Sequence, residues 1–408
     1  MNNKQSSTIF NITVLVAALG YFVDIYDLLL FQIVRVDSLK DMGLTTAQVK
    51  SEGEFIISIQ MIGLLVGGII WGIMGDKKGR LSVLFGSIVL YSIANIVNGF
   101  VQTPNQYALT RFFAGIGLAG ELGAGITLVS ELVSKEKRGL STALVAGIGI
   151  TGAVAAYFIS ENFDWRICYF IGGGLGFCLL LLRISVFESG MFNKLKQQNV
   201  QRGNFFMFFT NKHRFKKYLL AILIGLPTWY VVGILIAFSN DFGKAFGFSD
   251  AVLPKKSTMF AYMAIAAADV TAGFVSNWLR SRKKTLFIFY VLTVISLIFY
   301  FTQQGGTAAG MYLICAALGF STGFWAIFVT MAAEQFGTNL RATAATTAPN
   351  MVRGALPLLL FFFKGIQSAN INYITAGWIT GAIVMVISLL AAWFTEETFG
   401  KDLNYVES

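Results

Sequence analysis

The sequence predicts an all-α membrane protein of twelve transmembrane helices, arranged as two pseudo-symmetric six-helix bundles. Composition gives the first reason, because 55% of the 408 residues are hydrophobic, 13% are charged and the mean hydropathy is +0.67. Length gives the second reason, since a spanning helix needs about 20 apolar residues and the chain therefore holds about twelve helices with short loops. A charge pattern that occurs twice gives the third. Together these observations exclude a soluble protein and leave no room for a separate soluble domain.

The repeated pattern places similar charges in both halves of the chain. The first copy comprises Asp76, Arg80, Glu131 and Arg138. The second copy comprises Asn277, Arg280, Glu334 and Arg341. The two glutamates are offset by 203 residues, and so are the two arginines that follow them. Two copies of one membrane unit are typical of transporters whose halves enclose a central site.

Apolar stretches give the first six helices in order. They lie at 10–34, 55–75, 81–101, 106–132, 140–160 and 166–187. The first stretch follows a short polar start and carries carboxylates, so we expect helix 1 rather than a cleaved signal peptide. Glycines recur in the second, fourth, fifth and sixth stretches, where they let helix backbones approach closely in lipid.

The second half repeats this order after a basic linker. Its apolar stretches lie at 217–239, 257–279, 285–302, 307–332, 343–366 and 373–395. We place the first bundle at 1–188, the linker at 189–216 and the second bundle at 217–408. The linker contains His213, the only histidine, and is expected to be a solvated segment beside anionic lipid.

Basic residues predict the orientation of the helices. With the N-terminus inside, 20 Lys and Arg residues fall in cytoplasmic segments and seven fall in the opposite segments. The positive-inside rule therefore places both termini in the cytoplasm, in a multi-pass protein of the inner membrane. The net charge of +10 then reflects orientation, and we expect no nucleic-acid partner.

No sequence pattern indicates an enzyme or a cofactor. The three cysteines lie in apolar stretches and are expected to be small core residues rather than a disulfide or a metal site. A phosphate-binding Gly-Lys-Thr loop, a metal-ligand cluster and a nucleophile–base set are all missing from the sequence. The expected partners are a small-molecule substrate, protons and the lipid bilayer, and the expected state is a monomer.

Several segments resemble the major facilitator superfamily. Asp-Lys-Lys-Gly-Arg at 76–80 resembles its loop 2–3 signature, and Arg-Phe-Phe-Ala-Gly-Ile-Gly at 111–117 resembles the helix 4 signature of sugar and organic-ion porters. The stretch 20–27 and Ala-Gly-Glu at 119–121 resemble bacterial metabolite:proton symporters. The resemblance implies the twelve-helix fold and the transport of carboxylates, zwitterions or similar metabolites. Helix 7 reads Leu-Pro-Thr-Trp-Tyr at 226–230 where sugar porters carry a Gln-rich signature.

Charges inside the membrane are the candidates for proton coupling. Each costs roughly 3 kcal/mol at bilayer depth and therefore faces the protein interior or a water-filled path. They are Asp24 and Asp27 on helix 1 and Arg111 and Glu121 on helix 4. Our hypothesis is that Asp27 carries the proton and that Arg111, within reach at a similar depth, is its partner. The resemblance supports it, because such an Asp–Arg pair couples protons in sugar porters. A permanent salt bridge is the alternative, and Glu121 is either a second proton site or a ligand for a cationic group.

Arg353, in the middle of helix 11, is the main candidate for substrate binding. A guanidinium is always charged and binds carboxylates in a bidentate fork, so we expect it to bind an anionic group of the substrate. The alternative is that Asp269, in the middle of helix 8, is its partner. Further mid-span candidates, polar or aromatic, are Gln60, Trp229, Tyr230, Tyr262, Trp325 and Asn350.

The cytoplasmic signatures are expected to form a gate. The set comprises Asp76, Arg80, Glu131, Arg138, Glu334 and Arg341. Asp76 is expected to accept hydrogen bonds at a helix N-terminus across the interface between the halves. The leading interpretation is a symporter that moves a small carboxylate or zwitterion with protons by alternating access. A proton-independent facilitator or exchanger of a small polar metabolite or sugar is the alternative. A receptor that binds without transport is disfavoured, since no appended signalling domain is expected.

Overall fold

The computed structural model describes residues 12–133, 138–182, 203–369, 371–402 and 405–407. The side chains of some helical residues, among them Glu131 and Arg138, lie outside this description. Within the described ranges the chain is almost entirely helical and contains no β-strand. Eleven helical stretches there are long and apolar enough to cross a membrane. The expected all-α membrane fold is confirmed.

The first half runs from α1 to α8. Its helices are α1 (Ile12–Asp41), α2 (Thr46–Lys78), α3 (Arg80–Asn98), α4 (Pro104–Leu118), α5 (Glu121–Leu132), α6 (Arg138–Ile150), α7 (Gly152–Asn162) and α8 (Trp165–Leu182). The first two helices are longer than their apolar cores at 10–34 and 55–75. The backbone stays helical through these polar turns because Arg35 packs over the ring of Phe238 at 5.2 Å, and because Thr45 forms a capping box with Gln48.

The second half runs from α10 to α19. Its helices are α10 (Met207–Thr210), α11 (Lys212–Tyr230), the π-helix η2 (Val231–Ile236), α12 (Ser239–Ala245), α13 (Pro254–Trp278), α14 (Arg282–Phe301), α15 (Ala308–Ser321), α16 (Trp325–Glu334), α17 (Arg341–Gly354), α18 (Leu356–Ser368) and α19 (Tyr373–Phe394). The stretch predicted at 343–366 is not one helix but α17 and α18, with Ala355 between them. At 14 and 13 residues, each piece alone is shorter than the roughly 20 residues that a single span needs.

Helix interruptions recur at corresponding places in the two halves. Gly120 lies between α4 and α5, and Gly323, 203 residues later, lies between α15 and α16. Thr151 separates α6 from α7, and Ala355 separates α17 from α18. The repeat seen in the charges therefore extends to the path of the backbone.

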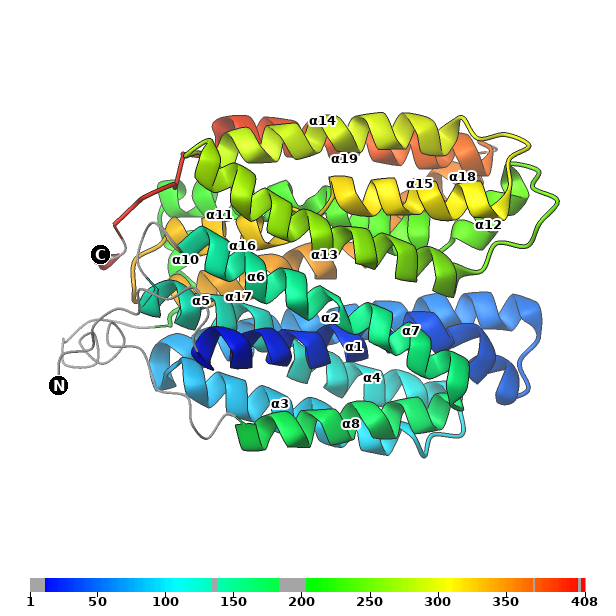
Figure 1. Cartoon of the computed structure of the whole chain (residues 1–408), viewed down its shortest axis with the longest axis horizontal. Coiled ribbons are helices and arrows are strands. Elements are labelled where there is room, and N and C mark those ends of the chain that lie inside the picture. The colour runs from blue at the N-terminus through cyan, green and yellow to red at the C-terminus, as the bar shows by residue number, and fades with distance from the viewer. Residues whose placement is uncertain (1–11, 134–137, 183–202, 370, 403–404, 408) are drawn as a thin grey trace.

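Figure 1 shows the first-half helices in its lower part and most second-half helices in its upper part, with α17 beside α5. The halves meet along α2 and α17 and along α6 and α13. The start of α1 and residues 405–407 lie at one end of the molecule, which we call the tail end. Within the first half, α2 and α4 cross closely because Gly115 carries no side chain. A Cβ there would lie 2.4 Å from the carbonyl oxygen of Gln60.

Candidate functional site

Asp76 joins the two halves at the tail end. It lies near the end of α2, and its carboxylate accepts hydrogen bonds from the backbone N–H groups of Ala342 (3.1 Å) and Thr343 (2.8 Å). The Thr343 hydroxyl adds a third, at 2.7 Å. Because α17 begins at Arg341, these donors belong to the positive end of its helix dipole. A fully buried carboxylate of the first half therefore caps a helix of the second half.

Arg80 contacts the Asp76 carboxylate and neighbouring backbone oxygens. Its guanidinium lies 3.5 Å from the Asp76 carboxylate and donates to the backbone carbonyl oxygens of Gly75 (2.9 Å) and Thr338 (3.5 Å). Arg341 is buried at the start of α17. The structure thus brings Asp76 and Arg80 together. The remaining first-half gate candidates, Glu131 and Arg138, have side chains outside the described part of the chain.

The second copy of the charge pattern forms a different network. Glu334 pairs with Arg282 at 3.3 Å and accepts a hydrogen bond from the Thr398 hydroxyl at 2.8 Å. Arg282 also donates to the Ser276 hydroxyl at 2.9 Å. The repeated pattern in the sequence runs from Asn277 to Lys284 and contains both Arg280 and Arg282. The offset of 202 residues from Arg80 to Arg282, close to that of the glutamates, is the signal that identifies the correct residue.

Asp27 and Arg111 form a fully buried ion pair with a distance of 2.9 Å. Arg111 also donates to the Asn95 side chain at 3.1 Å and to the backbone oxygen of Asp27 at 3.2 Å. The ring of Tyr169 lies 5.3 Å from the guanidinium carbon. All these partners come from α1, α3, α4 and α8, so the network lies inside the first half. Breaking one partner of such a buried pair is costly, because it leaves an uncompensated charge.

The other polar candidates of the first half lie on α1, α5 and α2. Asp24 is fully buried on α1, one turn before Asp27. Glu121, at the start of α5, accepts a hydrogen bond from the Ser87 hydroxyl on α3 at 3.4 Å. Gln60 donates to the backbone oxygen of Leu28 at 3.1 Å.

A central cavity lies between the two halves. Its lining residues are Tyr21, Ile25, Leu28, Ile150, Thr228, Trp229, Tyr262, Ile265, Trp325 and Arg353. The free volume is about 20 Å³, which is room for roughly one water molecule. A ligand of several heavy atoms therefore enters only when the halves move apart.

Among the described residues that line the cavity, Arg353 is the one cation. Its Nη1 donates to the Asn350 side chain at 3.1 Å, and its guanidinium carbon lies 5.9 Å and 5.6 Å from the ring centres of Trp229 and Trp325. Among the described residues, no carboxylate lies within 4.0 Å of it. A buried guanidinium with unused donors is unfavourable unless an anion pairs with it.

Asp269 is not the partner of Arg353. One oxygen of its carboxylate accepts a hydrogen bond from the backbone N–H of Ala326 at 3.0 Å. Asn350 connects Arg353 to the first half, because its side-chain amide donates to the carbonyl oxygen of Ala119 at 2.8 Å.

Three of the four aromatic candidates line the cavity, and one does not. Tyr230 donates to the Gly377 carbonyl oxygen at 2.7 Å on α19 and lies outside the cavity lining, whereas Trp229, Tyr262 and Trp325 belong to it. Sequence analysis did not single out Tyr21. Its position three residues before Asp24 on one helix face is the signal that would have found it.

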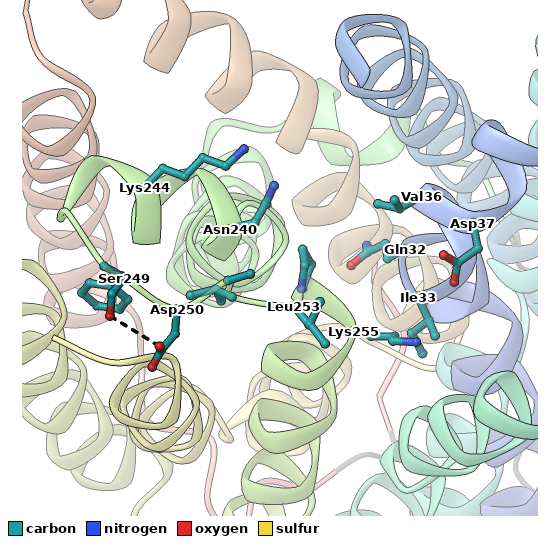
Figure 2. Close-up of a pocket in the computed structure, with 14 residues that line it drawn as sticks. Gln32, Ile33, Val36, Asp37, Asn240, Lys244, Ser249, Asp250, Leu253 and Lys255 are labelled. Carbon is teal, nitrogen blue, oxygen red and sulfur yellow. Dashed lines mark hydrogen bonds between the residues drawn. The ribbon is translucent and has the colours of Figure 1, made fainter. Parts of the chain in front are cut away.

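A larger cavity of about 450 Å³ opens at the end opposite the tail end. We call it the vestibule. Figure 2 shows Gln32 and Asp37 of α1 on one side of it and Asn240 and Lys244 of α12 on the other.

Ion pairs also join the two halves, and one of them includes Lys255 of the vestibule lining. Lys255 pairs with Glu161 at 2.5 Å, Lys50 with Asp241 at 3.7 Å, and Lys364 with Glu54. These contacts are partly exposed, in contrast to the buried Asp76 contact at the tail end.

Known proteins match this chain over nearly its whole length. A family model described as Major Facilitator Superfamily matches residues 8–355. The niacin transporter of Acinetobacter baylyi is 25% identical, over 97% of this chain and 96% of the relative. The gentisate transporter of Corynebacterium glutamicum is 24% identical, over 90% and 86%. A structure of the proton:xylose symporter XylE, bound to 6-bromo-6-deoxy-D-glucose, superposes with a TM-score of 0.78 at 18% identity, covering 98% of both chains.

Proposed function

Because this chain belongs to the Major Facilitator Superfamily, we propose that it moves a small organic anion together with protons through the central cavity. The family is one of transporters, so the chain is a multi-pass membrane transporter of a small molecule and not an enzyme. We propose in addition the class of its substrate, the ion that drives transport and the side of the membrane on which its termini lie.

Arg353 is the observation that supports an anionic substrate. It is the only cation among the described residues that line the cavity, and its buried Nε has no hydrogen-bond acceptor there, which leaves a donor for a carboxylate oxygen. Trp229 and Trp325 flank it with flat apolar surfaces that suit a planar ring. Niacin and gentisate, named for two relatives, are both aromatic rings that carry a carboxyl group. The substrate class proposed is therefore a planar organic monocarboxylate.

The Asp27–Arg111 pair is the proposed proton site. The helix that carries Asp27, α1, also contributes Tyr21, Ile25 and Leu28 to the cavity lining. Protonation of Asp27 removes its attraction for Arg111, so the two helices that carry the pair are free to shift relative to each other. A monoanion that enters with one proton adds no net charge to the cavity, which keeps the cost of burying it low.

Alternating access follows from the contacts at the two ends. In this proposal the tail end and both termini are cytoplasmic, and Asp76 closes the inner gate. The partly exposed ion pairs between the halves close the outer gate. The bundles at 1–188 and 217–408 rock against each other as a monomer, joined by the linker at 189–216.

Uptake into proteoliposomes tests the proposal. Radiolabelled nicotinate and gentisate should accumulate when the external pH is below the internal pH. In Arg353→Lys the KM should rise about tenfold or more, because an ammonium group cannot reproduce the bidentate fork. Arg166→Lys is the matched control, since Arg166 is a partly exposed partner of Asp41 far from the cavity lining.

Three results would contradict the proposal in different ways. An uptake rate that is the same with and without the pH gradient would indicate a facilitator or exchanger. Binding without uptake would indicate a receptor. An unchanged KM in Arg353→Lys would exclude the carboxylate site, whatever the coupling.

A further inference from the structure

The spanning stretch Ala308–Glu334 is interrupted beside the central cavity. It runs as α15 to Ser321 and resumes as α16 at Trp325, one of the residues that line the cavity. Backbone polar groups released by such a break need new partners, because lipid and apolar side chains offer none. The question is therefore which side chains take their place.

Side chains from three neighbouring helices bind the groups at the break. On α14, the Thr293 hydroxyl donates to the Ser321 carbonyl oxygen at 3.0 Å, and on α11, the Thr228 hydroxyl donates to the Thr322 carbonyl oxygen at 3.4 Å. The third partner is Asp269 of α13, which accepts the hydrogen bond of the Ala326 N–H at 3.0 Å.

The negative charge of Asp269 and the close packing of α13 against the break both favour a bond from Asp269 to the start of α16. Its side chain is fully buried, has no cation within 4.0 Å among the described residues, and faces the positive end of the α16 dipole. Gly323 allows the break to lie directly on α13, since a Cβ there would come 2.3 Å from the Cβ of Ala268.

We propose that Asp269 is a positioning residue that fixes Trp325 over Arg353 by capping the N-terminus of α16. This deepens the proposed function and rests on it, because the substrate is taken to lie between Trp325 and Arg353. The side chain acts as a hydrogen-bond acceptor for the backbone. It binds neither the substrate nor the coupling proton.

Asn and Ala at position 269 separate this role from a role of the charge. Asp269→Asn keeps an acceptor oxygen and should retain the wild-type KM for nicotinate, because Asn caps helices as well as Asp does. Asp269→Ala removes the acceptor and should raise the KM about tenfold, with a smaller effect on the maximal rate. Hydrogen–deuterium exchange at the first turn of α16 should speed up about tenfold in Asp269→Ala and stay at the wild-type rate in Asp269→Asn.

Two glycine variants provide a second test that does not touch Asp269. Gly323→Ala should push the break away from α13 and reproduce the faster exchange and the higher KM. Gly310→Ala, on the same helix α15, is its control, because a Cβ there would meet only the Thr307 hydroxyl at an ordinary 3.5 Å. If Asp269→Ala cannot be purified, the glycine pair carries the test.

The outcomes distinguish the two proposals. If Asp269→Asn fails as badly as Asp269→Ala, or if Gly323→Ala behaves like Gly310→Ala, the positioning role is overturned. If the wild-type protein transports neither nicotinate nor gentisate but the exchange pattern is as stated, the positioning role stands and the proposed substrate class fails.

Discussion

Replacement of Asp76 by Asn should open the tail end of the molecule. The carboxylate accepts three hydrogen bonds from the start of α17, two of them from Thr343. An Asn side chain keeps one acceptor oxygen. Its NH₂ group replaces the second oxygen and cannot accept the hydrogen bonds that this oxygen accepted. It also loses the attraction of Arg80 at 3.5 Å.

The magnitude follows from those bonds. Hydrogen bonds to charged groups contribute about 1.5–3 kcal/mol each, and the Thr343 hydroxyl can turn to accept from the new amide. The net loss is therefore about one charged bond, roughly 2 kcal/mol, which corresponds to a shift of about 30-fold in the ratio of open to closed tail ends.

Alkylation of a buried cysteine measures that ratio. Thr346 is 1% exposed and packs against Gly123 beneath the gate, so Thr346→Cys reports on opening in a chain without Cys168, Cys178 and Cys315. Asp76→Asn should raise the rate of labelling by N-ethylmaleimide about 30-fold. Asp250→Asn, at an exposed loop position, should leave it unchanged. An equal rate in Asp76→Asn and its parent would refute the role of Asp76 in closing the tail end.

Three further predictions concern coupling, packing and pH. Asp27→Asn should abolish accumulation driven by a pH gradient and leave counterflow exchange measurable, and full accumulation in this variant would exclude Asp27 as the proton carrier. Gly115→Ala should lower both the yield of monodisperse protein and its Tm, since the added Cβ would lie 2.4 Å from the Gln60 carbonyl oxygen. An unchanged Tm would contradict the close crossing of α2 and α4. At Glu397, beyond the last spanning helix, burial raises the pKa. Hydrogen bonds from the Ser281 hydroxyl and three backbone N–H groups outweigh it and lower the pKa below its usual 4.5. Because the folded-state pKa is depressed, this stabilisation is present above about pH 4.5 and is lost as the pH falls through the folded value, so the Tm should drop less steeply below pH 4.5 in Glu397→Gln than in the wild type. Parallel Tm curves of the two proteins would show that the contact contributes nothing.

Hydropathy was sufficient to predict the helices, because the cost of placing polar backbone in lipid leaves few alternatives. The end of α1 escaped prediction, since Arg35 in its last polar turns contacts Phe238, which is distant in the sequence. The polar start of α2 was also missed, although its capping box of Thr45 and Gln48 is a local signal. The interruption at Gly120 was also missed. Glycine is common in uninterrupted spanning helices, so its presence alone indicates nothing. Its recurrence at Gly323 was the available signal.

Depth along a helix is predictable from sequence, but the direction of a side chain around the helix is much less so. The match in depth between Asp27 and Arg111 was enough to predict their contact, because both lie on the interior side of one bundle. The same reasoning could not tell whether Asp269 faces Arg353 or the break between α15 and α16. Trp229 and Tyr230 are neighbours in sequence and point to different surroundings, a difference fixed by the packing of α11 against α19.

Asn350 gives the molecule a direct route by which cargo can influence the seam between its halves. One end of its amide holds the Ala119 carbonyl oxygen of the first half, and the other end holds Arg353. In the proposed cycle, an anion that binds Arg353 after the halves have moved apart would compete with the Asn350 oxygen for the same guanidinium. Binding of the anion would thereby weaken a contact that holds the halves together.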